Sequence, residues 1–366
     1  MGYYKNAFEL SEQLLEKEDN EPLDNVFAEL GFVYIEADYF KEAVLYFDES
    51  LKYNAENIDV LSDLAYAHEM LGDFDAAILA TNTILDIEPY TYEAWINLGK
   101  LHSLKEDYEK AIDAFEFAFT INDSDDTVLK LKAHCMSLCG RQEEAIEIFR
   151  TLLESDEDGS IYLLIAECYQ SLGLFDEAIE ALKEYKNAEG ETEEYLSKLA
   201  YVYLQKEDFL QAKQTVLKGL ELNPESFDLN MTAGEIEFKQ GEYEEAELYY
   251  LSIYPQNKDS FQLLDRMALL NIKVENYQEA AYHTEKLLEI DPNNLAVKER
   301  LALLYFEIDD KIEFNTILDQ FTDNELLDLF QLIYVPQSPD LFDREMLISY
   351  LNRAREARTL FKNLKY

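Results

Sequence analysis

Residues 92–125 read YEAWINLGKLHSLKEDYEKAIDAFEFAFTINDSD, and this stretch decides the fold. Apolar residues recur at i, i+3, i+4 and i+7 in two runs, which predicts two amphipathic helices. Gly99 lies in the first run, and Ala111 follows twelve residues later in the second. Small side chains let two helix backbones approach closely, so the stretch predicts a tightly packed helix pair.

The same pattern recurs along the chain with a period of 34 residues. The small residues of the first run are Gly31, Ala65, Gly99, Ala133, Ala166, Ala200, Gly234, Ala268 and Ala302. The alanines of the second run are Ala43, Ala77, Ala111, Ala145, Ala178, Ala212, Ala246 and Ala280, spaced by 34 except for 33 between Ala145 and Ala178. Such a lattice predicts a repeat protein that forms one continuous body.

The period divides the chain into nine units with a further segment at each end. The units are 24–57, 58–91, 92–125, 126–158, 159–192, 193–226, 227–260, 261–294 and 295–322, and the ninth is degenerate, with Lys311 and Phe314 where an aromatic residue and an alanine belong. Residues 1–23 fit the second half of a repeat, so they are either a lone capping helix or the remainder of a longer chain. The sequence of residues 323–366 predicts capping helices at the carboxy-terminal end, with a basic tail.

The best copy of the repeat resembles the tetratricopeptide-repeat (TPR) family. The matching residues are Trp95, Leu98, Gly99, Tyr108, Ala111, Phe115 and Ala118, whereas His102 and Asp123 depart from the consensus. The resemblance implies an all-α, right-handed superhelical solenoid of about nine helix pairs. The tracts 88–123 and 299–310 look similar to multi-repeat TPR proteins of Bacteroidetes bacteria.

The resemblance also implies where a ligand binds. In this family, positions 2, 5, 9 and 12 of each unit face a concave groove lined by the first helices. These positions hold a partly basic amino-terminal group, comprising Phe32, Tyr66, Ile96, Lys100, Lys130 and His134, and a more apolar group, comprising Tyr201, Leu204, Met231, Phe238, Leu269 and Ile272. The first group suits a peptide or helix with an acidic group and an apolar anchor. Local charge balance and burial between helices are the alternative interpretation.

The carboxy-terminal tail differs in charge from the rest of the chain. Residues 341–366 hold six basic and three acidic residues, a net charge of +3, whereas the remaining chain carries −49. The last predicted helix places Arg355, Arg358, Lys362 and Lys365 near one stripe. This basic helix either caps the solenoid by pairing with the acidic body or folds toward the groove and competes with ligands.

Composition limits the classes of partner. A formal net charge of −46 repels phosphate backbones, so we expect no nucleic-acid binding. No apolar run is long enough to span a membrane, and we expect no membrane contact in this chain. The three cysteines, Cys135, Cys139 and Cys168, lie in helical patterns and are expected to be reduced core thiols, which suits a cytoplasmic location.

No arrangement typical of an enzyme is found in the sequence. It contains no Gly-rich phosphate loop, nucleophile elbow or HExxH metal motif, so we expect no catalytic activity and no cofactor. The leading hypothesis is a scaffold that binds a protein or peptide partner in its concave groove. Two alternatives stay open, a structural element that oligomerises through its ends and a regulatory subunit of an enzyme; the oligomeric state is not predicted.

Overall fold

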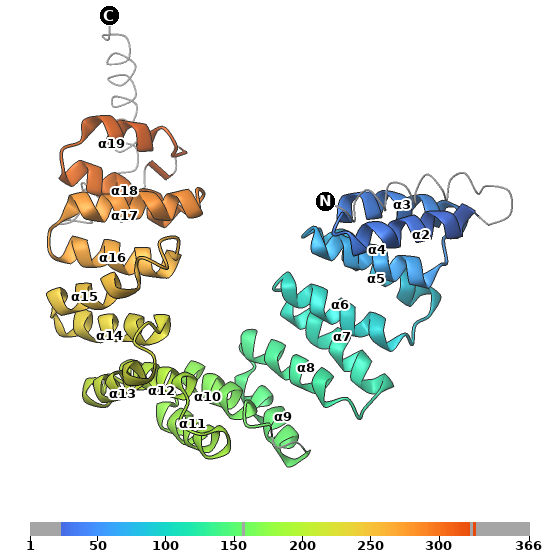
Figure 1. The fold of residues 1–366 in the computed structure, drawn as a ribbon, viewed down its shortest axis with the longest axis horizontal. Helices are drawn as coiled ribbons and strands as arrows, with labels where there is room; N and C mark the ends of the chain where they lie inside the picture. Colours follow the sequence, from blue (N-terminus) through green and yellow to red (C-terminus); the bar gives the residue numbers. More distant parts are fainter. Residues whose placement is uncertain (1–22, 156–157, 323–324, 327–366) are drawn as a thin grey trace, which may run out of the picture. The chain divides into compact units, whose positions relative to one another are not determined.

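The computed structural model describes residues 23–155, 158–322 and 325–326 (Figure 1). Within these residues every regular element is an α-helix, and consecutive helices pack as antiparallel pairs. The all-α fold of about nine helix pairs expected from the sequence is confirmed. The predicted capping segments lie outside the described residues, apart from residues 23, 325 and 326.

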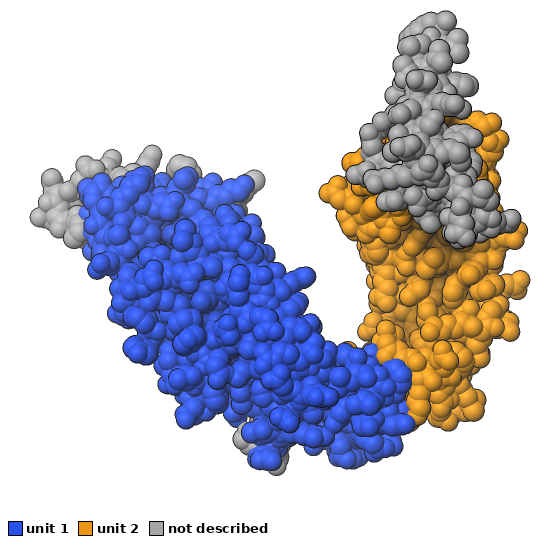
Figure 2. Space-filling view, turned by 180° about the vertical axis from the view of Figure 1, so that it is seen from behind, with its two compact units in different colours: residues 1–192 blue, residues 193–366 orange. Residues whose placement is uncertain are grey.

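The chain divides into two compact units, residues 1–192 and residues 193–366, which are coloured separately in Figure 2. In each helix pair we call the member that comes first in the chain the first helix, and its partner the second helix. The helices of the first unit are α2 Leu23–Glu36, α3 Phe40–Tyr53, α4 Ile58–Met70, α5 Phe74–Ile87, α6 Tyr92–Leu104, α7 Tyr108–Ile121, α8 Asp126–Leu138, α9 Gln142–Ser155, α10 Ile161–Ser171 and α11 Phe175–Glu189.

The second unit continues the same alternation of first and second helices. Its helices are α12 Glu193–Gln205, α13 Phe209–Leu222, α14 Phe227–Gln240, α15 Tyr243–Ile253, α16 Phe261–Lys273, α17 Tyr277–Ile290, α18 Leu295–Glu307 and α19 Lys311–Leu318. The short α19 belongs to the ninth repeat, residues 295–322, whose sequence departs most from the repeat pattern.

The core of each pair forms where the small residue of the first helix meets the second helix. A Cβ atom added to Gly234 would lie 2.2 Å from Cε1 of Tyr250, whose side chain is completely buried. Gly99 is crowded in the same way by the ring of Phe115. At the equivalent place in the preceding pair, Ala200 accompanies the smaller Val216. At Gly234 and Gly99 an added methyl group would therefore clash with the ring that fills the space between the two helices.

One turn joins the two helices of every pair. Its central residue has a left-handed backbone (φ 56–91°) in all nine pairs, at Asp38, Gly72, Glu106, Gly140, Gly173, Glu207, Gly241, Glu275 and Asp309. The next backbone N–H donates to the carbonyl five residues earlier, for example from Leu174 to Tyr169 at 2.9 Å. This bond satisfies a carbonyl at the end of the first helix and fixes the turn.

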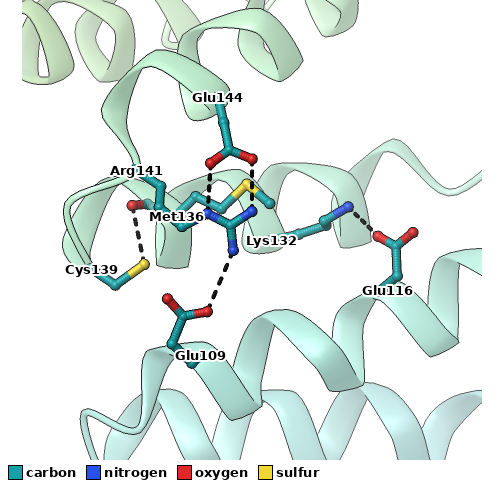
Figure 3. Close-up of polar contacts among 7 residues, drawn as sticks. All are labelled: Glu109, Glu116, Lys132, Met136, Cys139, Arg141 and Glu144. Atoms are coloured by element: carbon teal, nitrogen blue, oxygen red, sulfur yellow. Dashed lines mark hydrogen bonds and ion pairs between the residues drawn. The ribbon is translucent and has the colours of Figure 1, made fainter.

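Polar contacts link neighbouring pairs on the surface. Figure 3 shows the Arg141 guanidinium donating to both carboxylate oxygens of Glu144, at 2.8 and 2.7 Å, and to Glu109 of the preceding pair at 3.4 Å. Lys132 forms an ion pair with Glu116, which also joins α8 to the preceding pair. These residues are partly exposed, so each ion pair contributes no more than about 1 kcal/mol.

Candidate functional site

A pocket of about 400 Å³ lies over three successive first helices of the second unit, α12, α14 and α16. The residues that line it are Ser197, Lys198, Tyr201, Leu204, Gln205, Asp228, Met231, Thr232, Glu235, Lys239, Gln262 and Arg266. Counted from the first residue of each repeat, they occupy positions 2, 5, 6, 9, 12 and 13. The pocket therefore follows one face of the first helices from pair to pair.

Helix caps and packing fix the backbone beneath this pocket. Ser226 caps α14 by accepting the backbone N–H of Leu229, and Ser260 caps α16 by accepting that of Leu263. Such caps define where a helix starts and which face it presents. Behind α14, the Tyr250 ring rests against Gly234 and holds the helix from the core side.

The pocket differs in charge from the protein as a whole. Its lining includes three cations, Lys198, Lys239 and Arg266, against two carboxylates, Asp228 and Glu235. Nε of Arg266 lies 3.2 Å from Oε2 of Glu235, and the Glu235 side chain is only 18% exposed. This small positive excess, in a chain of net charge −46, favours a ligand that carries a carboxylate.

Two polar atoms near the base of the pocket lack hydrogen bonds among the described residues. They are Oε2 of Glu235, which nevertheless forms the ion-pair contact with Arg266, and the hydroxyl of Tyr250. Burial raises the pKa of Tyr250, and the negative charge of Glu235 raises it further. The hydroxyl therefore stays neutral, with the capacity to donate a hydrogen bond.

The six predicted residues of the apolar group separate into two sets. Tyr201, Leu204 and Met231 line the pocket; Leu204 and Met231 are buried, whereas Tyr201 is 45% exposed. The other three do not line it. Phe238 packs against the core with its ring 5.5 Å from that of Tyr243, Ile272 packs against the core of the last pairs, and Leu269 is half-buried. Tyr201 is thus the exposed aromatic residue of the pocket.

The apolar residues of the amino-terminal group are spread over three pairs. Phe32 lines a smaller pocket of about 360 Å³ on α2 and packs edge-on against Phe47, at 5.4 Å between ring centroids. Tyr66 is 44% exposed, with its ring 6.1 Å from that of Phe40. Ile96 is half-buried on α6.

The two lysines of that group have different surroundings. Nζ of Lys130 lies 2.6 Å from Oδ2 of Asp158 and donates to Oγ of Ser160 at 3.2 Å, so it ties α8 to the start of the next pair. Lys100 is exposed and has no ion pair within the described part of the chain. His134 is exposed on α8. The interpretation as local charge balance therefore describes Lys130 but not Lys100.

Sequence reasoning missed the charged side chains of the pocket. Lys198 and Arg266 occupy position 6 of their repeats and Lys239 occupies position 13, whereas the groove-facing positions implied by the family resemblance are 2, 5, 9 and 12. Residues three or four places from position 9 lie on the same helix face. Applying that rule to the first helices would have found these cations. The predicted basic tail, with Arg355, lies outside the described residues.

The cysteines and histidines form no second site. Cys135 and Cys168 are buried free thiols, as expected, but Cys139 is only half-buried, and its thiol donates to the carbonyl oxygen of Met136. Across the described residues, no group of three or more His, Cys, Asp or Glu side chains could hold a metal ion. Nor is any helix in that part of the chain long and apolar enough to cross a membrane.

Family models match segments in both compact units of the chain. Residues 140–192 and 197–260 match one model and residues 92–125 match another, and both models are described as tetratricopeptide repeat. These segments are tetratricopeptide repeats. The fold is accordingly an all-α TPR solenoid, and the pocket helices α12 and α14 lie largely within a matched TPR segment.

Several solved structures resemble this chain at low sequence identity. MamA is 22% identical over 44% of this chain and 94% of its own, with a TM-score of 0.41. The Cut9–Hcn1 complex of the APC/C is 18% identical over 76% of this chain and 55% of the matched chain, with a TM-score of 0.47. YrrB, described as a TPR protein with an unusual peptide-binding site, is 16% identical over 50% and 95%, with a TM-score of 0.40. No curated protein matches the sequence.

Proposed function

We propose that this TPR protein is a non-catalytic scaffold that binds an extended peptide, or an exposed segment of a partner protein, in the pocket over α12, α14 and α16. The observation that carries this proposal is the combination, on one face of three first helices, of the exposed Tyr201 ring with a small excess of cations. An aromatic ring supplies an apolar contact area, and Lys239 or Arg266 supplies a partner for a carboxylate.

The expected ligand therefore carries one acidic group beside an apolar or aromatic side chain. Arg266 already contacts Glu235, so a ligand carboxylate would share Arg266 with Glu235 or bind Lys239. Lys239 is exposed and forms no ion pair among the described residues. A ligand that lies across three successive pairs also gains affinity from several weak contacts without a deep cavity.

The test is selection of peptides from a random library on the immobilised full chain, followed by measurement of their dissociation constants by fluorescence anisotropy. We expect selected peptides to combine an acidic with an aromatic or aliphatic residue. Tyr201→Ala/Lys239→Glu should weaken binding by about tenfold or more, which corresponds to about 1.4 kcal/mol.

A matched control changes the same residue types on the first unit. Tyr66→Ala/Lys100→Glu alters two exposed residues, each at position 9 of its repeat. Both residues are far along the sequence from the pocket. Loss of binding in this control alone would move the site to the amino-terminal group. If neither variant changes the affinity, or if the library yields no specific peptide, the pocket is not the binding site.

A further inference from the structure

A second groove, of about 580 Å³, lies within the first unit between α9, α10 and α11. The first helix α10 supplies its floor through Tyr162, Ile165 and Tyr169. The second helices α9 and α11 supply the walls, so this groove lies between second helices, whereas the pocket described above lies over first helices. Its lining combines an apolar floor with charged walls.

The floor of the groove lacks an aromatic cover that is present in the third repeat. In the third repeat, residues 92–125, Trp95 stacks on Phe117, with ring centroids 4.6 Å apart and an interplanar angle of 20°. In the fifth repeat, residues 159–192, the equivalent residues are Tyr162 and Glu184. A carboxylate cannot replace an aromatic ring as a stacking partner. Tyr162 therefore lacks the stacked ring that covers Trp95 in the third repeat.

The wall formed by α11 is acidic. Glu177, Glu180 and Glu184 follow one another at i, i+3 and i+7, so they form a stripe along one face of the helix, and Asp176 adds a fourth carboxylate. Lys183 forms an ion pair with Glu180 at 2.6 Å, on the exposed side of α11.

The opposite wall contributes one cation, which does not neutralise this stripe. Nη2 of Arg150 donates to the hydroxyl of Tyr169 at 2.6 Å. The residues that line the groove thus carry four carboxylates and one guanidinium, a net charge of −3. An occupant must therefore offer cations beside an apolar surface.

Residues 341–366 of the chain have this chemistry. In the sequence, Arg355, Arg358 and Lys362 repeat the i, i+3, i+7 spacing of the acidic stripe, and the apolar residues Ala354, Ala357, Phe361 and Leu364 recur at i, i+3, i+7 and i+10. The segment carries +3, equal and opposite to the groove lining. We propose that the groove between α9, α10 and α11 docks the carboxy-terminal segment 341–366 of a second copy of the chain.

The tail and the groove carry complementary charges, and we choose the tail of a second copy as the occupant. Two bodies of −49 repel each other, and a basic segment that enters an acidic groove offsets part of this repulsion. Docking between copies also requires no particular arrangement of the two units within one chain. The inference is independent of the proposed function, because it concerns another surface.

The experiment measures the mass of the full chain by sedimentation over a range of concentrations at low ionic strength. We expect reversible association of the wild type that weakens as salt is added. Glu177→Lys/Glu184→Lys should weaken association by about tenfold or more, since two favourable contacts become repulsive. The matched control, Glu244→Lys/Glu245→Lys on α15, makes the same change of charge at exposed positions and should associate as the wild type does.

Charge exchange makes the test specific. Arg355→Glu/Lys362→Glu should also fail to associate alone, but an equal mixture with Glu177→Lys/Glu184→Lys should form mixed oligomers, because each chain then meets a complementary surface. Circular dichroism checks that every variant is folded; if the lysine variant unfolds, Glu177→Gln/Glu184→Gln replaces it. A wild type that stays monomeric, a control that weakens equally, or a mixture that does not associate would each overturn the proposal.

Discussion

Nζ of Lys130 and Oδ2 of Asp158 lie 2.6 Å apart, and this ion pair joins the first helix α8 to the last residue of the same repeat, in the connection that leads to α10. The hydrogen bond from Lys130, with a second from Ser160, lowers the pKa of Asp158 to about 2. Both side chains are about one-third exposed, so solvent screening reduces the stability that the pair provides.

We predict that Asp158→Asn lowers the free energy of unfolding by about 1 kcal/mol at neutral pH. A depressed pKa stabilises the fold above the unfolded-state pKa of about 4, and this stabilisation disappears as the pH falls through the folded-state value. The difference between wild type and variant should therefore be constant above about pH 5 and vanish between about pH 4 and 2. Urea titrations at several pH values measure it, with Asp113→Asn, an exposed aspartate on α7, as control.

Gly234→Ala should destabilise the seventh repeat through a steric clash. The added methyl group would lie 2.2 Å from the buried Tyr250 ring, and we expect a loss of about 1–3 kcal/mol in urea unfolding. Repeat six carries Ala200 and Val216 at these positions, so Gly234→Ala/Tyr250→Val should lose less than the sum of the single changes. Strict additivity would contradict the proposed contact.

Tyr250→Phe removes a buried hydroxyl that has no hydrogen bond within the described residues. Removing an unsatisfied polar group relieves a desolvation penalty, so the variant should be as stable as the wild type or more stable by up to about 1 kcal/mol. Thermal and urea unfolding give the answer. A clear loss of stability would mean that the hydroxyl has a hydrogen-bond partner in solution.

Gly173→Ala should destabilise the turn between α10 and α11 without any clash. Gly173 has φ of 73°, and no atom lies within 4 Å of an added Cβ, so the cost is that of a left-handed backbone, about 1 kcal/mol. Glu207 adopts φ of 62° in the next pair, and Glu207→Gly should cost less than Gly173→Ala or should stabilise. Equal losses for both changes would show that the turn conformation is not the cause.

The sequence was sufficient to predict the fold because the lattice that defines it is local. Each small residue, such as Gly99, lies in the same helix pair as the alanine that follows it, so one period describes the packing of all pairs. The binding surface was harder to predict because it depends on how successive pairs combine. Lys130, for example, contacts Asp158 in the connection between pairs and Ser160 of the next repeat, and sequence spacing alone does not predict these contacts.

Other sequence-based interpretations stay predictions. Apolar character alone did not distinguish Tyr201, which is exposed in the pocket, from Phe238, which packs against the core. The role of the basic tail, the resemblance to Bacteroidetes proteins and the alternative of an enzyme's regulatory subunit await experiment.

The conserved geometry of the turn within each pair determines where the repeat can change in length. Twelve residues separate the small residue from the following alanine in every pair that has both, for example from Ala166 to Ala178, because the left-handed turn and its hydrogen bond close over a fixed number of residues. The single shorter period, between Ala145 and Ala178, falls instead in the connection between pairs. We therefore expect a change in length to be tolerated in the connection between pairs and to be disruptive in the turn within a pair.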